Sequence, residues 1–106
     1  MTKVVIEAGA CGFSAVVSAR KNDRRSVTVT ITTECIELSK MAEHLETLHL
    51  RDILKIPVAA NPVFEAASRY HVHPGCPVPC AVIKAAEVEL ELSLPRNPTI
   101  TFATDE

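Results

Sequence analysis

Four cysteines are the residues of this 106-residue sequence best suited to chemistry: Cys11, Cys35, Cys76 and Cys80. Their spacing differs from that of zinc fingers and ferredoxins, because the sequence has neither two CxxC pairs nor three closely spaced cysteines. The chain begins with a strand-like segment instead of an apolar signal segment, so we expect it in the cytoplasm, where thiols stay reduced. A metal centre or a redox role is therefore favoured over structural disulfides.

Three roles are open for these thiols. In the first, all four hold one metal centre, a Zn²⁺ ion or an iron–sulfur cluster. Such a centre would be structural or electron-carrying, because four protein ligands leave no position for a reacting water. In the second, Cys76 and Cys80 cycle between dithiol and disulfide in a thiol enzyme or switch. In the third, the domain is metal-free and structural or partner-binding, since cysteine is also common in protein cores.

Two histidines just before the last two cysteines are further candidate ligands. His71 and His73 alternate along an extended segment, so their side chains point the same way and could complete a site with Cys76 and Cys80. Histidines that follow a helix can instead bond to its terminal carbonyls. The two remaining histidines are predicted to lie on the surface: His44 and His49.

The composition argues against several classes of function. Eleven basic and thirteen acidic residues give a formal charge of −2, which does not suit a nucleic-acid surface. The longest apolar runs, such as residues 56–60 and 76–83, are far shorter than the ~18 residues of a membrane span. No Gly-Lys-Ser/Thr phosphate loop is present. We therefore expect neither a nucleic-acid partner nor a membrane partner.

The first third of the sequence predicts three strands. Residues 3–8 lead to a glycine-rich turn, residues 9–12, which carries Cys11. Residues 13–20 and 26–32 alternate between apolar and polar side chains, and a short polar turn joins them. These two strands should form a hairpin whose threonine-lined side faces water.

Helices are expected after these strands. Apolar residues recur at steps of three and four over residues 35–48, which predicts an amphipathic helix of about thirteen residues. An Asn-Pro pair predicts a short helix over residues 62–70, because Asn accepts bonds from the first amides and Pro fits the first turn. A third helix is expected over residues 79–86. Residues 49–60 favour neither helix nor strand.

The end of the sequence predicts a second hairpin. Acidic and aliphatic residues alternate over residues 87–94, which is the period of a strand, and residues 99–104 place Ile100 and Phe102 on one side. The order is then three strands, helices and two strands. This order predicts one α+β domain over residues 1–106, with a mostly antiparallel sheet and helices packed on one face.

These elements could bring the cysteines together. Cys11 follows the first strand, Cys35 begins a helix, and Cys76 and Cys80 lie at the start of another. If these ends share one edge of the sheet, the four thiols converge on one place. Helix N-termini carry a partial positive charge, which lowers the pKa of a thiol and favours the metal-binding thiolate.

A domain this small with one layer of helices leaves part of its sheet uncovered. We expect a symmetric homodimer that pairs through a sheet edge or through the threonine-lined face. The apolar residues 53–60 are a second candidate surface for a copy of the chain or for another protein.

Two resemblances to known families add expectations. Residues 76–87, together with residues 8–13 and 34–35, resemble a family of short uncharacterised single-domain proteins found chiefly in anaerobic bacteria and archaea. This resemblance implies no activity, but an anaerobic setting would suit an iron–sulfur cluster. Residues 76–90 resemble the osmotically inducible proteins and organic hydroperoxide reductases, in which a Cys-Pro helix carries one of two redox thiols. The second resemblance implies peroxide-reducing thiol chemistry.

Overall fold

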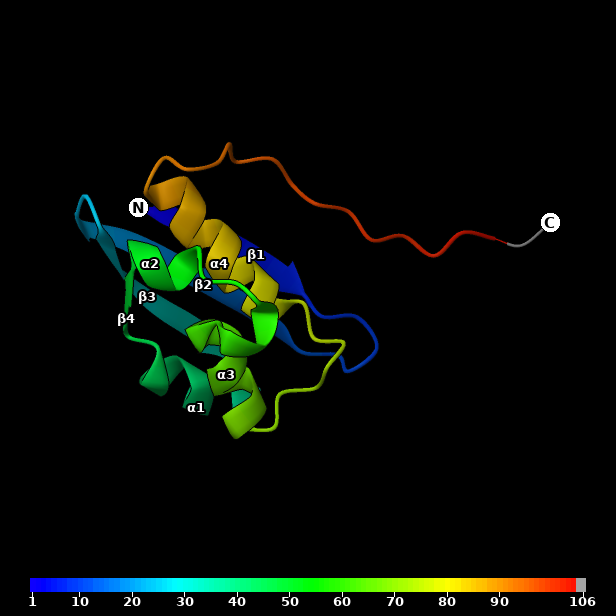
Figure 1. Cartoon of the computed structure of the whole chain (residues 1–106). Helices are drawn as coiled ribbons and strands as arrows, with labels where there is room; N and C mark the ends of the chain where they lie inside the picture. Colours follow the sequence, from blue (N-terminus) through cyan, green and yellow to red (C-terminus); the bar gives the residue numbers. More distant parts are fainter. Residues whose placement is uncertain (105–106) are drawn as a thin grey trace.

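Three strands at the start of the chain form most of the sheet (Figure 1). The computed structural model describes residues 1–104, in which β1 (Thr2–Glu7), β2 (Ser14–Asp23) and β3 (Ser26–Thr33) pair antiparallel in chain order. A short fourth strand, β4 (Thr47–His49), pairs with β3 and gives the order β1-β2-β3-β4. The predicted antiparallel sheet is therefore confirmed.

Side chains that alternate along these strands give the sheet one apolar face and one open face. Ala15, Val17 and Ala19 of β2 are buried under the helices, as are Val27 and Val29 of β3. The helices all lie over this apolar face, as Figure 1 shows. The α+β class with helices on one face is therefore confirmed as well.

The helical layer contains four α-helices and one 3₁₀ helix within residues 1–104. They are α1 (Ile36–His44), α2 (Leu50–Ile53), η1 (Val58–Ala60), α3 (Pro62–Arg69) and α4 (Val78–Glu89). None of these helices is long and apolar enough to cross a membrane. The prediction of a helix over residues 62–70 is confirmed within one residue.

The helix predicted over residues 35–48 is shorter in the structure. α1 ends at His44, and Leu48 lies in β4 opposite Val27 of β3. Leu45 and Leu48 are both buried, so the apolar positions were identified correctly. Residues 47–49 pair with the edge of β3 instead of continuing the helix, so tertiary context overrides the helical period.

Residues 49–60, for which the sequence favoured no element, contain α2 and η1. Ile53 is buried, whereas Leu54, Ile56 and Val58 are exposed. Asn61 closes this segment and is itself buried. Its Oδ1 accepts the Val63 amide at 3.0 Å and caps α3. Its side-chain Nδ2 donates to carbonyls of the preceding segment, those of Asp52 at 3.0 Å, Ile53 at 3.5 Å and Lys55 at 3.1 Å.

The predicted second hairpin is wrong. Residues 87–89 continue α4, which ends at Glu89, and residues 90–104 form neither helix nor strand. The inner positions of α4 explain the continuation, because Val82, Ala85 and Ala86 are fully buried at helical spacing against β1 and β2. The alternation over residues 87–94 does not reveal that α4 extends into it, and burial of the inner positions of α4 on the sheet decides the structure of residues 87–89.

Glu89 fastens the end of α4 to the first hairpin. Its Oε1 accepts a hydrogen bond from the Thr2 hydroxyl at 2.8 Å, and its Oε2 accepts one from the Lys21 amide at 2.9 Å. The Met1 amino group lies 3.7 Å from Oε1. The Lys21 amide and then the Thr2 hydroxyl hold the pKa of the Glu89 carboxyl below its ordinary value.

Replacing Glu89 by glutamine should lower the free energy of unfolding by about 1 kcal/mol at neutral pH, because charge-assisted hydrogen bonds are lost. Since the pKa is lowered in the folded state, this contribution is complete above the ordinary pKa of a glutamate and is lost as the pH falls through the lowered value. Urea denaturation of both proteins should therefore give stabilities that converge in acid. Glu91→Gln, at an exposed neighbour, is the control, and a loss that is equal at every pH would contradict this role.

Candidate functional site

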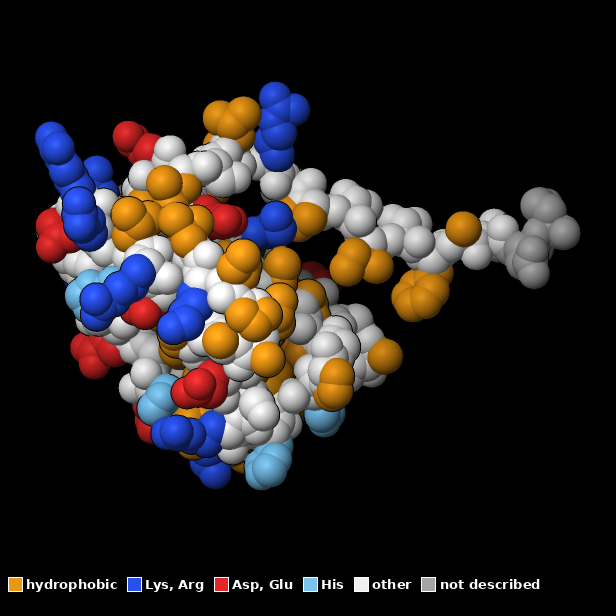
Figure 2. All heavy atoms as spheres, in the orientation of Figure 1, with side chains coloured by type: hydrophobic (Ala, Val, Ile, Leu, Met, Phe, Trp, Pro, Cys, Tyr) orange, Lys and Arg blue, Asp and Glu red, His pale blue; other side chains and the backbone are white. Residues whose placement is uncertain are grey.

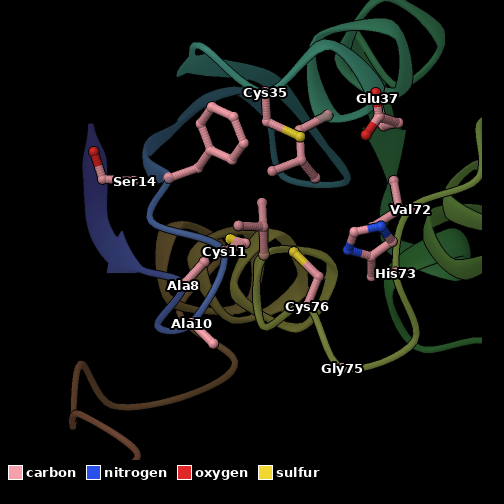
Figure 3. Close-up of a pocket in the computed structure, with 13 residues that line it drawn as sticks. Ala8, Ala10, Cys11, Ser14, Cys35, Glu37, Val72, His73, Gly75 and Cys76 are labelled. Atoms are coloured by element: carbon pink, nitrogen blue, oxygen red, sulfur yellow. The ribbon is translucent and has the colours of Figure 1, made fainter.

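Three of the four cysteines line one cleft at the end of the sheet. The cleft has a volume of about 240 Å³ and is lined by Cys11, Cys35 and Cys76. These residues precede β2, α1 and α4 respectively, so segments far apart in the sequence supply them. Figure 3 shows their sulfur atoms pointing toward the same space. The predicted convergence therefore holds for these three thiols.

The turn between β1 and β2 presents Cys11. Gly9 and Gly12 on either side of it have φ angles of 89° and 80°, a region that other residues rarely adopt. The Gly12 amide donates to the Gly9 carbonyl at 2.9 Å, and the Ala8 amide donates to the Phe13 carbonyl at 3.1 Å. The turn is thus closed by its own backbone, and Cys11 is exposed at its tip.

Cys35 occupies the N-cap position of α1. Its amide donates to the Thr33 hydroxyl at 3.2 Å, and its carbonyl accepts the Ser39 amide at 3.0 Å. The side chain makes no capping bond, so the thiol remains available to the cleft. Cys35 is half-buried against the core.

Cys76 lies two residues before α4. Its amide donates to the His73 carbonyl at 3.0 Å, which holds the turn before the helix. Burial raises the pKa of the Cys76 thiol, and this effect outweighs the opposing hydrogen bond from the Val78 amide. The neighbouring Cys35 and Cys11 raise the pKa of the Cys76 thiol further.

The walls of the cleft are mostly apolar, and the sequence did not point to them. Phe13, Leu38, Val72 and Val78 line it beside the thiols. Alternation around Phe13 and the helical period at Leu38 marked both as inward-facing, but periodicity does not reveal which inward residues surround a cavity. Glu37, Ser14 and His73 are the polar lining residues other than cysteine.

The histidines separate into distinct positions. His73 lines the thiol cleft, whereas His71 lies in an adjoining polar cleft beside Lys40 and Arg69. Both are exposed. The two other histidines are exposed as predicted, and the His44 ring packs edge-on against Tyr70 with ring centres 5.9 Å apart.

Cys80 is not among the residues that line the cleft. It is exposed in the first turn of α4, while Cys76 precedes that helix. All four cysteines are free. Across residues 1–104, no three histidine, cysteine or acidic side chains lie close enough to hold a metal ion in the conformation described.

Comparison with known proteins gives a family without an assigned activity. No curated protein and no solved structure matches the chain. No match supports the narrower expectations of an anaerobic source or a likeness to hydroperoxide reductases. The family model of DUF6951, a family of unknown function, matches residues 2–102, nearly the whole sequence. The chain therefore belongs to the DUF6951 family.

Proposed function

We propose that this protein is a small metal-binding module in which Cys11, Cys35 and Cys76, with His73, hold a thiophilic ion such as Zn²⁺. The convergence of three thiols from three distant segments on one cleft carries this proposal. Three cysteines and one histidine are a common ligand set of structural zinc sites. Thiolate ligands favour zinc and other soft ions over magnesium or calcium.

The surroundings of the thiols favour a cation. Cys35 and Cys76 are half-buried in a mostly apolar cleft, where thiolates would repel one another and lose solvation, and a bound cation relieves both costs. The loss of solvation also strengthens the attraction between thiolate and metal.

Loading requires the donors to move closer, because no three of them are within reach of one ion in residues 1–104. The Cys11 turn is suited to that movement. A Cβ built on Gly9 or Gly12 would have no atom within 4 Å, so open space surrounds this turn. Cys35 and Cys76 are half-buried against the core and would form the fixed side of the site.

This ligand set differs from a four-cysteine centre by exchanging Cys80 for His73. His73 lines the cleft and Cys80 does not, which favours the exchange. With four protein ligands the ion would be structural, because a hydrolytic zinc site keeps one position open for water. A four-cysteine iron–sulfur cluster would additionally require Cys80 to reach the cleft.

A redox pair formed by Cys76 and Cys80 is the rival role. Reactive thiols have a lowered pKa and are accessible to solvent. Burial gives Cys76 a raised pKa instead, which opposes its use as a nucleophile at neutral pH. Cys76 lines the cleft with Cys11 and Cys35, whereas Cys80 does not, and this grouping favours the metal role over the dithiol role.

Metal analysis of protein purified under anaerobic conditions and without chelator tests the proposal. We expect about one equivalent of zinc per chain, as for other closed zinc sites. Cys35→Ser and Cys76→Ser should each lower this to less than about a tenth of an equivalent, because serine is a poor ligand for zinc. Cys80→Ser is the matched control and should retain the metal.

Three results would overturn this assignment. Less than about a tenth of an equivalent of any transition metal in the unmodified chain would leave the thiols as core or redox residues. Loss of metal in Cys80→Ser would restore the four-cysteine centre. A brown protein with iron and sulfide would replace zinc by an iron–sulfur cluster.

A further inference from the structure

The last segment of the described chain runs away from the rest of the molecule. After Leu90 the backbone forms no helix or strand up to residue 104, and Figure 1 shows it extending past the body. Hydrophobic side chains stand clear along this segment in Figure 2. Ile100 is 89% exposed and Phe102 is 100% exposed. Burial of a phenylalanine side chain is among the largest hydrophobic contributions to stability, and a fully exposed phenylalanine makes no such contribution.

The exposed segment has the sequence of a strand. Residues 99–104 read Thr-Ile-Thr-Phe-Ala-Thr, with hydroxyl and apolar side chains alternating over residues 99–102. β3 has the same pattern, with Val27 and Val29 buried and Thr30 exposed on the opposite face. Pro98 stands immediately before the segment, where proline is tolerated at the start of a strand. The DUF6951 match reaches residue 102, so Ile100 and Phe102 are part of the family domain.

The sheet offers an unpaired edge of the right length. β1 is a terminal strand of the order β1-β2-β3-β4, and no other strand within residues 1–104 pairs with its outer side. It has six residues, whereas β4 at the other edge has three. Val5 is 71% exposed on the open face. A long uncovered edge of this kind is a template for one more strand.

We propose that residues 99–104 of one chain add as a strand to the outer edge of β1 in a second copy, and that a reciprocal exchange forms a two-fold symmetric dimer. Backbone hydrogen bonds to the β1 edge would supply affinity, and side chains that alternate between the two faces would set the register. The exchange goes beyond the proposed metal site and uses none of its ligands.

The side-chain pattern fits this placement on both faces of the sheet. Ile100 and Phe102 would lie on the helix side, beside Val4 and Ile6 at the rim of the core, where Val4 is only partly buried. Thr99 and Thr101 would lie on the open face, beside the exposed Lys3, Val5 and Glu7 of β1. A shift by one residue would expose the apolar pair again, so the pattern selects one orientation.

A second copy is the favoured occupant because one chain carries both halves of the contact. Residues 99–104 extend past the body and stand clear of their own β1 (Figure 1), which presents the segment to another molecule. Each dimer would then contain two equivalent contacts, and closed two-fold assembly is the commonest form of homo-oligomer.

Light scattering of the full chain in reductant, at micromolar concentration, tests the exchange. We expect twice the chain mass of 11.5 kDa. The double variant Ile100→Lys, Phe102→Lys should fall to the single-chain mass. The matched control Thr99→Lys, Thr101→Lys adds the same charge on the other face of the strand and should keep the doubled mass. Both variants should fold, because no residue from 91 to 104 packs in the core, and circular dichroism checks this.

Hydrogen exchange in β1 provides a second readout. Alternate amides of β1 should exchange at least about tenfold faster in the Ile100, Phe102 variant than in the full chain, since the edge loses its partner. A single-chain mass for the unmodified full chain overturns the proposal. This holds whether the β1 amides are protected from exchange by the chain's own tail or are unprotected. A doubled mass that survives in this variant also overturns it and would indicate another surface, such as the exposed Leu54, Ile56 and Val58. Loss of the doubled mass in the Thr99→Lys, Thr101→Lys control would overturn the assignment of the threonines to the open face of the sheet.

Discussion

Replacing Asn61 by alanine should lower the free energy of unfolding by about 3 kcal/mol. The change removes the cap of α3, a loss of about 1 kcal/mol, and leaves carbonyls of Asp52 and Lys55 without their buried donor, a loss of about 1–3 kcal/mol. Urea denaturation measures the loss directly. Because Asn61 joins the segment before it to the helix after it, both elements should unfold together in the native chain.

Aspartate at the same position separates the two roles of Asn61. Asn61→Asp keeps an acceptor for the backbone amide of Val63. It places a carboxylate oxygen, which cannot donate, beside the carbonyls that accept hydrogen bonds from Asn61 Nδ2. We therefore expect a loss at least as large as that of the alanine variant at neutral pH. Asn97→Ala, in the exposed tail, is the control and should change stability by less than about 0.5 kcal/mol. A capping role alone would leave Asn61→Asp close to the unmodified protein.

Truncation of Met41 to alanine should cost about 2–5 kcal/mol, the range seen for large buried side chains. Met41 is the largest fully buried side chain and lies on the inner face of α1, which packs against β3 and α3. Met41→Leu, which keeps the volume, should cost less than about 1.5 kcal/mol. Glu43→Ala on the exposed face of the same helix is the control for helix propensity.

Thermal and urea unfolding of these α1 variants check the prediction. Equal free energies of unfolding for Met41→Ala and Glu43→Ala would contradict the packing of α1 against the sheet.

Local sequence predicted those elements for which the periodicity, the residue propensities and the capping residues indicate the same structure. The alternation of β2 and β3 coincides with strand-forming threonines and valines, and the Asn-Pro pair before α3 coincides with its cap. β4 could not be predicted, because three residues carry no period and their pairing depends on the free edge of β3. The end of α4 was misread because residues 87–94 alternate as a strand does, whereas the helix is held by earlier residues that are buried on a sheet that only the fold provides.

The candidate site was predictable in part. Placing Cys11, Cys35 and Cys76 at the ends of elements was sufficient to bring them together, because neighbouring ends meet at one edge of a small sheet. Cys80 lies outside the cleft lining for a local reason. Residues four apart share a helix face only if the helix includes both, and here Pro77 is the N-cap, so Cys76 lies outside the helix.

The hydrogen bond between Glu89 and Thr2 makes the folded body a nearly closed ring of chain. The start of β1 and the end of α4 lie side by side, and the tail departs from that junction. A circular permutant that omits the tail could join Glu89 to Thr2 through a short linker and begin at the exposed turn between β2 and β3 instead. Such a permutant would retain the three thiol-bearing segments in their present surroundings, because none of them lies at either junction.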